Sequence, residues 1–377
     1  MTAINHKKPI KVLEVIRQGQ IGGGETHLLD LVSHFNPQEV EAVVLSFTGG
    51  PMVDTLQQKG IKTYIVETSY PFDPRISKKI KTIIQSEKIC LIHAHGSRAA
   101  SNVVFLAHKL HIPFIYTVHG WSFHQSQSPL IYRLRCLSEK LICRYTKQVI
   151  CVSESNRFTG EKNFGLKKAT VIENGINLEK FDPDKASKNI REELGFQPDD
   201  LIVGFIARLT LQKAPLDFIK SILLAHKELP ALKALIVGEG DQQEEMQAFI
   251  QAQNARSYII TTPFRQDVPD LLHAIDIFCL PSLWEGLSIS LLEAMAMKKA
   301  LVVTPTDGTR ELITHERNGL IAPFSSPEKL ALCYIQYARH PDLMDKYAFV
   351  NRQIIEQRFD CRRVSEKVTE LYKTYIQ

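Results

Sequence analysis

Short apolar segments alternate along the chain with longer segments in which apolar side chains recur every three or four residues. The short segments are rich in Val and Ile and end at turn residues, a pattern typical of buried parallel strands. The longer segments have the spacing of helices with one apolar face. This alternation predicts a parallel sheet covered by helices on both faces. In the first half, strands are predicted at 11–16, 42–47, 62–66, 91–95, 114–118, 149–152 and 170–172.

The alternation stops at residues 173–200, which are rich in turn residues, and then starts again. We therefore predict two tandem doubly wound domains, 1–172 and 201–357, joined by a linker at 173–200. The end of the chain has only a helical pattern, and we expect the helix at about 358–377 to cross back onto the first domain. Strands of the second domain are predicted at 201–206, 235–237, 258–260, 277–280, 301–304 and 320–322.

The lengths of the apolar runs and the spacing of the cysteines indicate where in the cell the protein works. No apolar run reaches the ~18–20 residues that span a bilayer, and the polar N-terminus lacks the apolar core of a signal peptide. The seven cysteines are scattered and form no C-x-x-C pair, which favours a reduced, cytoplasmic protein without structural metal.

Charge is distributed unevenly between the two halves. Residues 1–172 hold 22 Lys and Arg against 12 Asp and Glu, whereas residues 173–377 hold 24 against 29. The basic half suits an anionic membrane surface or an acidic acceptor, although scattered surface charge gives the same totals. A leucine-rich, basic helix at 128–147 could dock on such a membrane, or it could cover the sheet.

The polar residues after strand 277–280 indicate a ligand-binding site. Glu285 lies in a glycine-containing loop, and Glu293 lies eight positions later among strong helix formers. A helix N-terminus binds anions because its first N–H groups lack intrahelical partners. The two carboxylates suit the hydroxyl groups of a sugar nucleotide on either side of its diphosphate. We therefore expect a sugar nucleotide to bind here.

Two cations bracket the loop after strand 201–206. Arg208 ends this strand and Lys213 begins the next helix, so both lie where open α/β sheets bind ligands. A guanidinium and an ammonium would neutralise a leaving diphosphate. Gly238, at the end of the neighbouring strand, leaves backbone open to the same crevice. The alternative is two ordinary surface cations.

In the first half, glycines and histidines follow strands. Gly23 and Gly24 open the first helix, where a backbone without side chains can approach a ligand, although an ordinary turn would also use glycine. This is not the dinucleotide G-x-G-x-x-G motif. His119 follows strand 114–118 and could donate a hydrogen bond to a substrate hydroxyl, carry a proton, or be structural.

Metal binding is not predicted. His93 and His95 have the H-x-H spacing of ligands on one strand face, but a third ligand with matching spacing is missing. We favour pocket lining or loop contacts for them. The D-x-D sequence at Asp182 and Asp184 lies in the predicted linker and is interpreted as a turn.

Taken in order, these motifs resemble those of the retaining glycosyltransferases of family 4, which have the GT-B fold of two Rossmann-like domains. The resemblance covers essentially the whole chain, and the combination is far more specific than any single motif. Its motifs are G-G-G-E, V-H-G-W, V-S-E-S, E-N-G-I-N, A-R-L-x-x-x-K, V-G-E-G and E-G-L-S-I-S-L-L-E.

The resemblance assigns roles in the second domain. It implies that Arg208 and Lys213 hold the donor diphosphate and that Glu293 binds the ribose. Glu285 would contact the transferred sugar. The backbone at Leu287 and Ser288 would cradle phosphate or sugar.

For the first domain, the resemblance implies that Gly23 and Gly24 lie against the diphosphate or the acceptor. His119 would stand at the reacting centre, where it stabilises and positions. Two departures leave the donor sugar open: the glycine pair usual after Thr304 is replaced at 306–309, and Ser288 stands where many members have Gly or Pro.

The expected function is transfer of a hexose, with retention and without metal or cofactor, from a UDP- or GDP-sugar to a hydroxyl acceptor. The expected acceptor is a glycan or lipid-linked molecule of the cell envelope, reached at the cytoplasmic membrane face; nucleic acid is not an expected partner. Two alternatives stay open. A nucleotide-sugar epimerase or hydrolase would need no acceptor, and a non-catalytic binding subunit would release no product.

Overall fold

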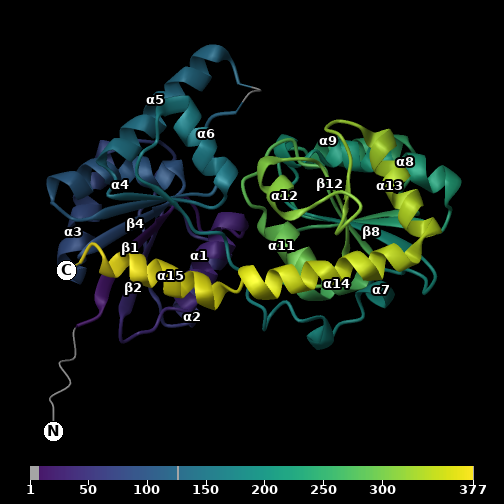
Figure 1. Cartoon of the computed structure of the whole chain (residues 1–377), viewed down its shortest axis with the longest axis horizontal. Helices are drawn as coiled ribbons and strands as arrows, with labels where there is room; N and C mark the ends of the chain where they lie inside the picture. The colour runs from purple at the N-terminus through teal and green to yellow at the C-terminus, as the bar shows by residue number, and fades with distance from the viewer. Residues whose placement is uncertain (1–7, 125–126, 377) are drawn as a thin grey trace, which may run out of the picture. The chain divides into compact units, whose positions relative to one another are not determined.

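A computed structural model describes residues 8–124 and 127–376 of the protein. The chain forms two compact units, Met1–Gly175 with Cys361–Gln377, and Ile176–Asp360. Each unit contains one parallel sheet between helices (Figure 1). The predicted α/β architecture of two Rossmann-like domains is therefore confirmed.

The sheet of the first unit has the strand order β3-β2-β1-β4-β5-β6-β7, and all of its pairings are parallel. The chain thus begins in the middle of the sheet, winds to one edge and then returns to fill the other. The strands are β1 (Ile10–Ile16), β2 (Val40–Ser46), β3 (Lys62–Ile65), β4 (Leu91–His95), β5 (Phe114–Val118), β6 (Gln148–Cys151) and β7 (Ala169–Val171).

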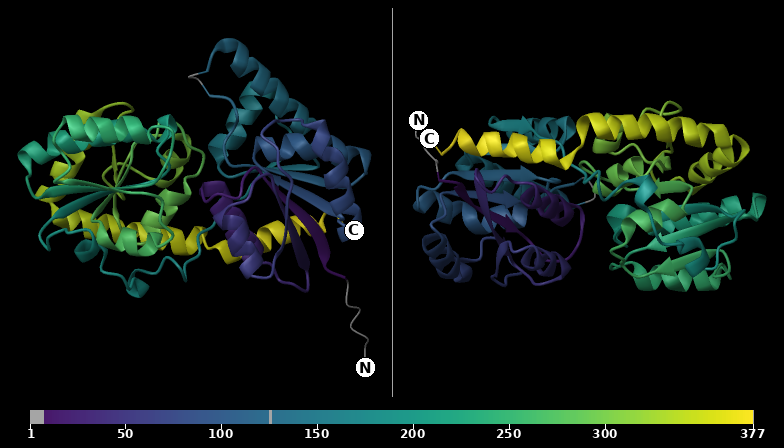
Figure 2. Two further views of the ribbon diagram at one scale, coloured as in Figure 1. Left: turned by 180° about the vertical axis from the view of Figure 1, so that it is seen from behind. Right: turned by 90° about the horizontal axis from the view of Figure 1, so that it is seen from below.

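Helices cover both faces of this sheet because successive strand residues point to opposite sides. Leu13 and Val15 face one core, shared with α3 and α4, whereas Val12 and Ile16 face the other, shared with α1, α2 and α15. Figure 2 shows α15, in yellow, against the sheet. The helices are α1 (Gly23–Ser33), α2 (Pro51–Gln58), α3 (Ser77–Glu87), α4 (Ser97–Lys109), α5 (Pro129–Tyr145), α6 (Glu154–Phe164) and α15 (Cys361–Lys373).

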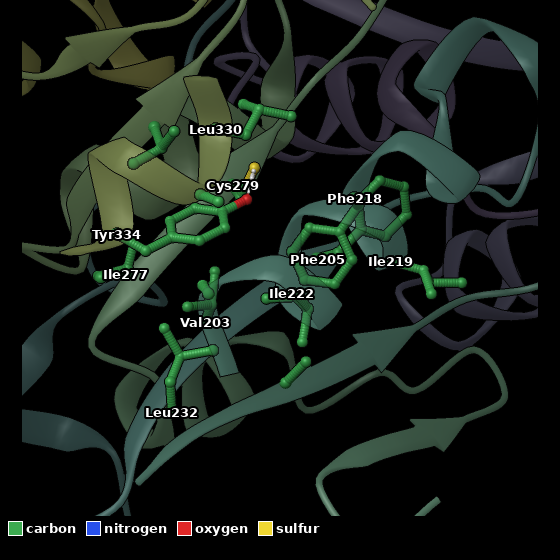
Figure 3. Close-up of a cluster of buried hydrophobic side chains, with 14 of the residues drawn as sticks. Val203, Phe205, Phe218, Ile219, Ile222, Leu232, Ile277, Cys279, Leu330 and Tyr334 are labelled. Carbon is green, nitrogen blue, oxygen red and sulfur yellow. Dashed lines mark hydrogen bonds between the residues drawn. The ribbon is translucent and has the colours of Figure 1, made fainter. Parts of the chain in front are cut away.

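The second unit repeats the plan with the strand order β10-β9-β8-β11-β12-β13. Phe205, Phe218 and Tyr334 pack in its core, where Tyr334 also hydrogen-bonds Cys279 (Figure 3). The strands are β8 (Leu201–Ile206), β9 (Leu232–Val237), β10 (Ile259–Thr262), β11 (Ile277–Leu280), β12 (Ala300–Val303) and β13 (Leu320–Ile321). The helices are α8 (Pro215–Glu228), α9 (Gln243–Ala252), α10 (Val268–Ala274), α11 (Ile289–Ala296), α12 (Asp307–Leu312), α13 (Pro327–Arg339) and α14 (Pro341–Arg358).

The segment expected to be a linker differs from that expectation. Most of it, from Ile176 onward, belongs to the second unit and includes the short helix α7 (Ile190–Glu193). Arg191 holds it there with two 2.8 Å hydrogen bonds to the Asp276 carboxylate. Residues 173–200 were predicted to be a linker because they are polar and rich in turn residues. Side chains such as Arg191 bind residues distant in sequence, and the local pattern does not show these contacts.

Helix α5 buries little of itself. Glu139 and Ile142 are its buried residues, whereas the leucine side is exposed, with Leu134 and Leu137 about 60% accessible. The helix still covers part of the first sheet through Ile142, which packs in its core, but the leucine side does not take part in this cover. Among the described residues, no helix combines the length and the apolar character needed to cross a membrane.

Candidate functional site

The site expected in the second unit lies where its sheet changes winding direction. The chain goes from β8 to β9 and β10, then returns to place β11 on the other side of β8. The ends of β8 and β11 are where a sheet with this change of direction usually binds its ligand. Arg208 and Lys213 follow β8, and Glu285 follows β11.

The structure brings Lys213 and Glu285 together as an ion pair. Their side chains are only 13% and 10% exposed, so water screens the pair weakly. The Ser282 hydroxyl donates to Glu285 Oε1 at 3.0 Å. Gln212 joins the two loops by two hydrogen bonds. Its side-chain Nε2 donates to the Trp284 backbone carbonyl at 2.8 Å, and its backbone carbonyl accepts from Leu283 N.

Arg208 is exposed in the loop between β8 and Lys213. The neighbouring Gly238 has φ +148°, and a Cβ there would lie 2.0 Å from the Ala207 carbonyl oxygen. Gly240 is equally constrained, because its Cβ would lie 2.2 Å from the Leu209 carbonyl oxygen. These glycines are therefore required for the close approach of the loops after β8 and β9, whatever ligand lies beside them.

The remaining predicted donor residues surround the start of α11. Ser288 is the residue before the helix, and its Oγ lies 3.1 Å from Ser290 Oγ. Leu287 and Glu293 are both buried, with Glu293 in the second turn. The loop after β12 packs closely against the loop before α11, since a Cβ at Gly308 would lie 1.7 Å from the Gly286 carbonyl oxygen.

The first unit assembles a second group of predicted residues. Gly23 and Gly24 open α1, and His119 follows β5. A Cβ at Gly24 would lie 3.4 Å from the His119 ring, so the glycine loop and the histidine face each other. The side chain of His27, one helical turn further along α1, lies against His119 with ring centroids 5.0 Å apart.

His119 is one end of a chain of polar groups that the sequence analysis did not identify. His119 Nε2 lies 3.3 Å from His95 Nδ1, and His95 Nε2 lies 2.9 Å from Glu14 Oε2. Tyr372 of α15 donates to the other oxygen of Glu14 at 2.6 Å. A carboxylate within the apolar run V-L-E-V-I of β1 was the one local signal that could have indicated the network.

Burial sets the protonation of these groups. It lowers the pKa of His119 and His27 well below the usual histidine value, and nearby histidines lower both further. Burial and His93 lower the pKa of His95 to about 4, against the opposing effect of Glu14. Burial alone would raise the pKa of Glu14, but its interactions with His93 and His95 hold it well below its usual value.

Two groups of these side chains have the spacing of metal ligands. The ligand atoms of His27, His95 and His119 lie within 4.8 Å of one another, as do those of Glu14, His93 and His95. Glu14 therefore lies beside His93 and His95 as a third group, which the spacing along the sequence did not indicate, while the absence of a bound metal stays a prediction. Three neutral imidazoles would suit an ion of the zinc type. In the second group, hydrogen bonds already occupy Glu14 and His93.

The D-x-D sequence forms a turn in the structure. Asp182 caps the 3₁₀ segment Pro183–Lys185 by accepting a hydrogen bond from Asp184 N at 3.2 Å. These carboxylates do not extend from a strand end of the sheet.

Family models match both units. A model described as Glycosyltransferase Family 4 matches residues 21–180, and one described as Glycosyl transferases group 1 matches residues 186–348. Among curated proteins, the Escherichia coli UDP-Gal:alpha-D-GlcNAc-diphosphoundecaprenol alpha-1,3-galactosyltransferase is 25% identical over 337 residues, 86% of each chain. The alpha-monoglucosyldiacylglycerol synthase of Acholeplasma laidlawii is 23% identical and covers 68% of each chain.

Solved structures agree on the fold. HepE of Anabaena, in complex with UDP and glucose, superposes with a TM-score of 0.85 at 22% identity, over 97% of this chain and 100% of its own. WaaG, a glycosyltransferase involved in lipopolysaccharide biosynthesis, gives 0.77 at 15% identity, over 96% and 99%. Both matched models, the similar enzymes and the shared GT-B fold lead to one conclusion: the chain is a glycosyltransferase that belongs to family 4.

Proposed function

We propose that the protein transfers a hexose from a nucleotide-diphospho-sugar to a hydroxyl acceptor, with retention at the anomeric carbon and without a metal ion. The observation that carries this proposal is the weakly screened Lys213–Glu285 pair on the loops that follow the adjacent strands β8 and β11. It supplies one group for a diphosphate and one for sugar hydroxyls on adjoining loops. Arg208 adds a second cation to the same loop.

In this proposal, Arg208 and Lys213 neutralise the charge that grows on the departing diphosphate, the task a divalent cation performs elsewhere. The N–H groups at Ser288 and the start of α11 bind the same phosphates. Glu285 contacts the sugar and Glu293 the ribose. In the first unit, Gly23, Gly24 and His119 keep the substrate-contacting roles that the resemblance to the family implies.

Retention follows from attack on the face that the diphosphate leaves. The acceptor oxygen bonds to the anomeric carbon while the bond to the phosphate oxygen breaks, and that phosphate oxygen takes the acceptor's proton. Glu285 is already held by Lys213 and Ser282, which makes it a poor covalent nucleophile.

We propose a UDP-sugar in preference to a GDP-sugar. The E. coli relative is named for transfer from UDP-Gal to a diphosphoundecaprenol-linked sugar, and structures of HepE hold UDP or UDP-glucose. The acceptor would then be a glycan or lipid-linked precursor of the cell envelope.

The test is transfer measured with Arg208→Ala and Lys213→Ala. Each should lose about 2–4 kcal/mol of transition-state stabilisation, as when one donor to a developing anion is removed. Lys220→Ala, an exposed lysine on α8, is the matched control and should keep full activity. Wild-type turnover in both site variants would contradict the assignment.

The same assay separates the rival functions. An epimerase or hydrolase would convert the UDP-sugar when no acceptor is present. A non-catalytic binding subunit would bind UDP but form no product with any acceptor pool. A transferase forms the glycosylated product and UDP together only when the acceptor is added.

We also propose that α5 binds the cytoplasmic face of an anionic membrane. Its exposed apolar side chains form a stripe that would enter the headgroup region, and its cations would meet lipid phosphates. The exposed apolar residues are Leu130, Ile131, Leu134, Leu137 and Leu141. The cations are Arg133, Arg135, Lys140 and Arg144.

Sedimentation with phosphatidylglycerol vesicles tests this proposal. Leu134→Glu combined with Leu137→Glu should abolish binding at low salt, while Leu332→Glu, at an exposed leucine of α13, should not. Added salt should weaken the wild-type interaction. A wild-type protein that ignores these vesicles at low salt would overturn it.

A further inference from the structure

Three histidine rings from three separate elements meet beside the glycine loop of the first unit. His27 lies on α1, His95 ends β4 and His119 follows β5. The ring centroids of His27 and His119 lie 5.0 Å apart, those of His95 and His119 5.5 Å, and those of His27 and His95 5.8 Å. His27 and His95 are buried, whereas His119 is partly exposed. Of the three rings, His119 therefore offers the route from solvent to the cluster.

The spacing of these rings matches that of ligands around one tetrahedral metal ion. One ligand atom of each ring lies within 4.8 Å of those of the other two, and His95 Nδ1 lies 3.3 Å from His119 Nε2. Nitrogens bound at about 2.0–2.1 Å to tetrahedral Zn²⁺ lie roughly 3.4 Å from each other, with ring centroids roughly 5 Å apart. His95 and His119 already have this separation, and the third ring lies at similar centroid distances.

The outer nitrogens of two of the rings have partners of the kind that support metal ligands. His95 Nε2 lies 2.9 Å from Glu14 Oε2, and Tyr372 donates to the other oxygen of this carboxylate at 2.6 Å. Asn174 makes a side-chain hydrogen bond with His119 that favours a hydrogen on this ring. Because Nε2 of His119 faces His95, we assign that hydrogen to Nδ1. A ligating histidine commonly donates its second N–H to an oxygen in this way.

These outer bonds determine what the inner nitrogens offer to each other. When His95 Nε2 donates to Glu14 and His119 Nδ1 donates to Asn174, His95 Nδ1 and His119 Nε2 face each other as two acceptors. A cation bound between them satisfies both lone pairs. It also brings positive charge near Glu14, which is fully buried and would otherwise depend on hydrogen bonds alone.

The neighbouring His93 is less suited to hold an ion. Its Nδ1 contacts Tyr372 Oη at 2.6 Å, and its Nε2 contacts Thr117 Oγ1 at 2.7 Å, so both of its nitrogens are engaged. A metal at His93 would leave one of these buried hydroxyls without its partner, which is unfavourable. The contacts therefore favour the group with His27 and His119 over the group with His93.

We propose that His27, His95 and His119 form a Zn²⁺ site, with His95 bound through Nδ1, His119 through Nε2 and a water molecule in the fourth position. Three imidazoles with one open position suit zinc, whereas Mg²⁺ prefers oxygen ligands. The site departs from the prediction that no metal binds, because His27 is not part of the H-x-H pattern. The ion has no part in the transfer step, and its binding does not depend on the proposed function.

Occupation of this site should inhibit transfer. Zn²⁺ takes the lone pair of His119 Nε2 and holds the ring toward His95, so that His119 no longer makes the substrate contact that the family resemblance implies. This consequence rests on the proposed function. Activity should be lost at saturating Zn²⁺ and return when EDTA removes the ion.

Metal titrations of EDTA-treated wild-type protein test the site without any substrate. Co²⁺, which can replace Zn²⁺ in a tetrahedral site, should give the visible absorption bands of tetrahedral nitrogen coordination, and Zn²⁺ should displace it. In protein labelled with ¹⁵N-histidine, Zn²⁺ should shift the resonances of His95 Nδ1, His119 Nε2 and one nitrogen of His27. Zn²⁺ bound only through cysteine sulfur, or no more tightly than Mg²⁺, would overturn the proposal.

Variants then assign the ligands. His27→Asn removes one ligand, keeps the contact between His95 and Glu14, and should lose the Co²⁺ bands. Glu14→Gln should weaken Zn²⁺ binding about 10–100-fold, as when the outer partner of a ligand is removed. His111→Asn is the matched control, because His111 is exposed in the same unit and its φ of +56° suits asparagine. Equal Zn²⁺ affinity in His27→Asn, His111→Asn and wild type would exclude the cluster.

Kinetics separate this inference from the proposed function. The rate with Zn²⁺ is divided by the rate in EDTA within each variant, so that a change in the basal rate does not enter the comparison. Zn²⁺ should inhibit the wild type and His111→Asn but not His27→Asn, and equal inhibition of all three would overturn the inhibitory role. If no UDP- or GDP-sugar gives product in EDTA, the proposed function fails, yet the titrations still confirm or overturn the zinc site.

Discussion

At the residue scale, the second unit depends on glycines where its loops meet. Gly308 in the first turn of α12 presses on the Gly286 carbonyl, beside the loop that holds Glu285. The Thr304 hydroxyl ties the same two loops by donating to the Ser282 carbonyl at 2.5 Å. The positions of the charged groups therefore depend on backbones that approach more closely than any side chain would allow.

Gly308→Ala should consequently destabilise the second unit. The new methyl group would overlap the Gly286 oxygen, and overpacking of this kind costs about 1–3 kcal/mol or more. Urea unfolding followed by circular dichroism measures the loss. Gly120→Ala is the control, because a Cβ there meets nothing within 4 Å and its φ is not positive. Equal stability of the two variants would refute the close contact.

The sequence could predict the proximity of some of these residues and not of others. Lys213 and Glu285 follow strands that any doubly wound sheet places side by side, so their proximity could be expected before the structure was known. Glu14 and Tyr372 are 358 positions apart. Only the return of α15 to the first sheet joins them, and neither residue carries a local pattern that names its partner.

At the element scale, α5 shows what a hydrophobic pattern leaves open. The leucine spacing correctly predicts a helix with one apolar side, but periodicity does not say what covers that side. In the structure, α5 is attached by Ile142 and by Glu139, whose Oε1 accepts 2.5 Å hydrogen bonds from the hydroxyls of Ser97 and Ser122. Glu139 and Ile142, and not the leucine stripe, hold this helix against the rest of its unit.

Glu139 should give the first unit a measurable pH dependence. Burial raises its pKa above the ordinary 4.5, although hydrogen bonds from Ser122, Ser97 and Tyr116 oppose the shift. The folded state therefore holds its proton at higher pH than the unfolded state does. Stability should fall as pH rises from about 4.5 through the raised pKa, because the folded protein must then bury a charge.

Glu139→Gln should remove this slope, since the amide oxygen can still accept from both serines while its NH₂ faces the Tyr116 hydroxyl. Urea unfolding between pH 4.5 and 8 measures it. Glu366→Gln, at an exposed position of α15, should retain the wild-type slope. A stability that rises with pH in the wild type and not in Glu139→Gln would show that the sign is reversed.

At the scale of the whole molecule, the chain passes between its two units twice, at Gly175–Ile176 and at Asp360–Cys361. The two passages run together: Ile176 N donates to the Phe359 carbonyl at 2.6 Å, and a Cβ at Gly175 would lie 2.5 Å from the Cys361 Cα. Sequence alternation predicted two domains and a returning helix. It could not locate the passages, because they depend on contacts between segments far apart along the chain.

The assignment of the donor site to the second unit gives a final prediction. If the second unit holds the donor, UDP should bind to it without the first, and binding to the folded state slows the local openings that permit hydrogen exchange. Mass spectrometry should find protection in segments 207–213, 237–241, 282–289 and 304–309, with α5 and α6 unchanged. Lys213→Ala should lose this protection and Lys220→Ala should keep it. Protection confined to residues 10–170 would mean that the nucleotide site has been assigned to the wrong unit.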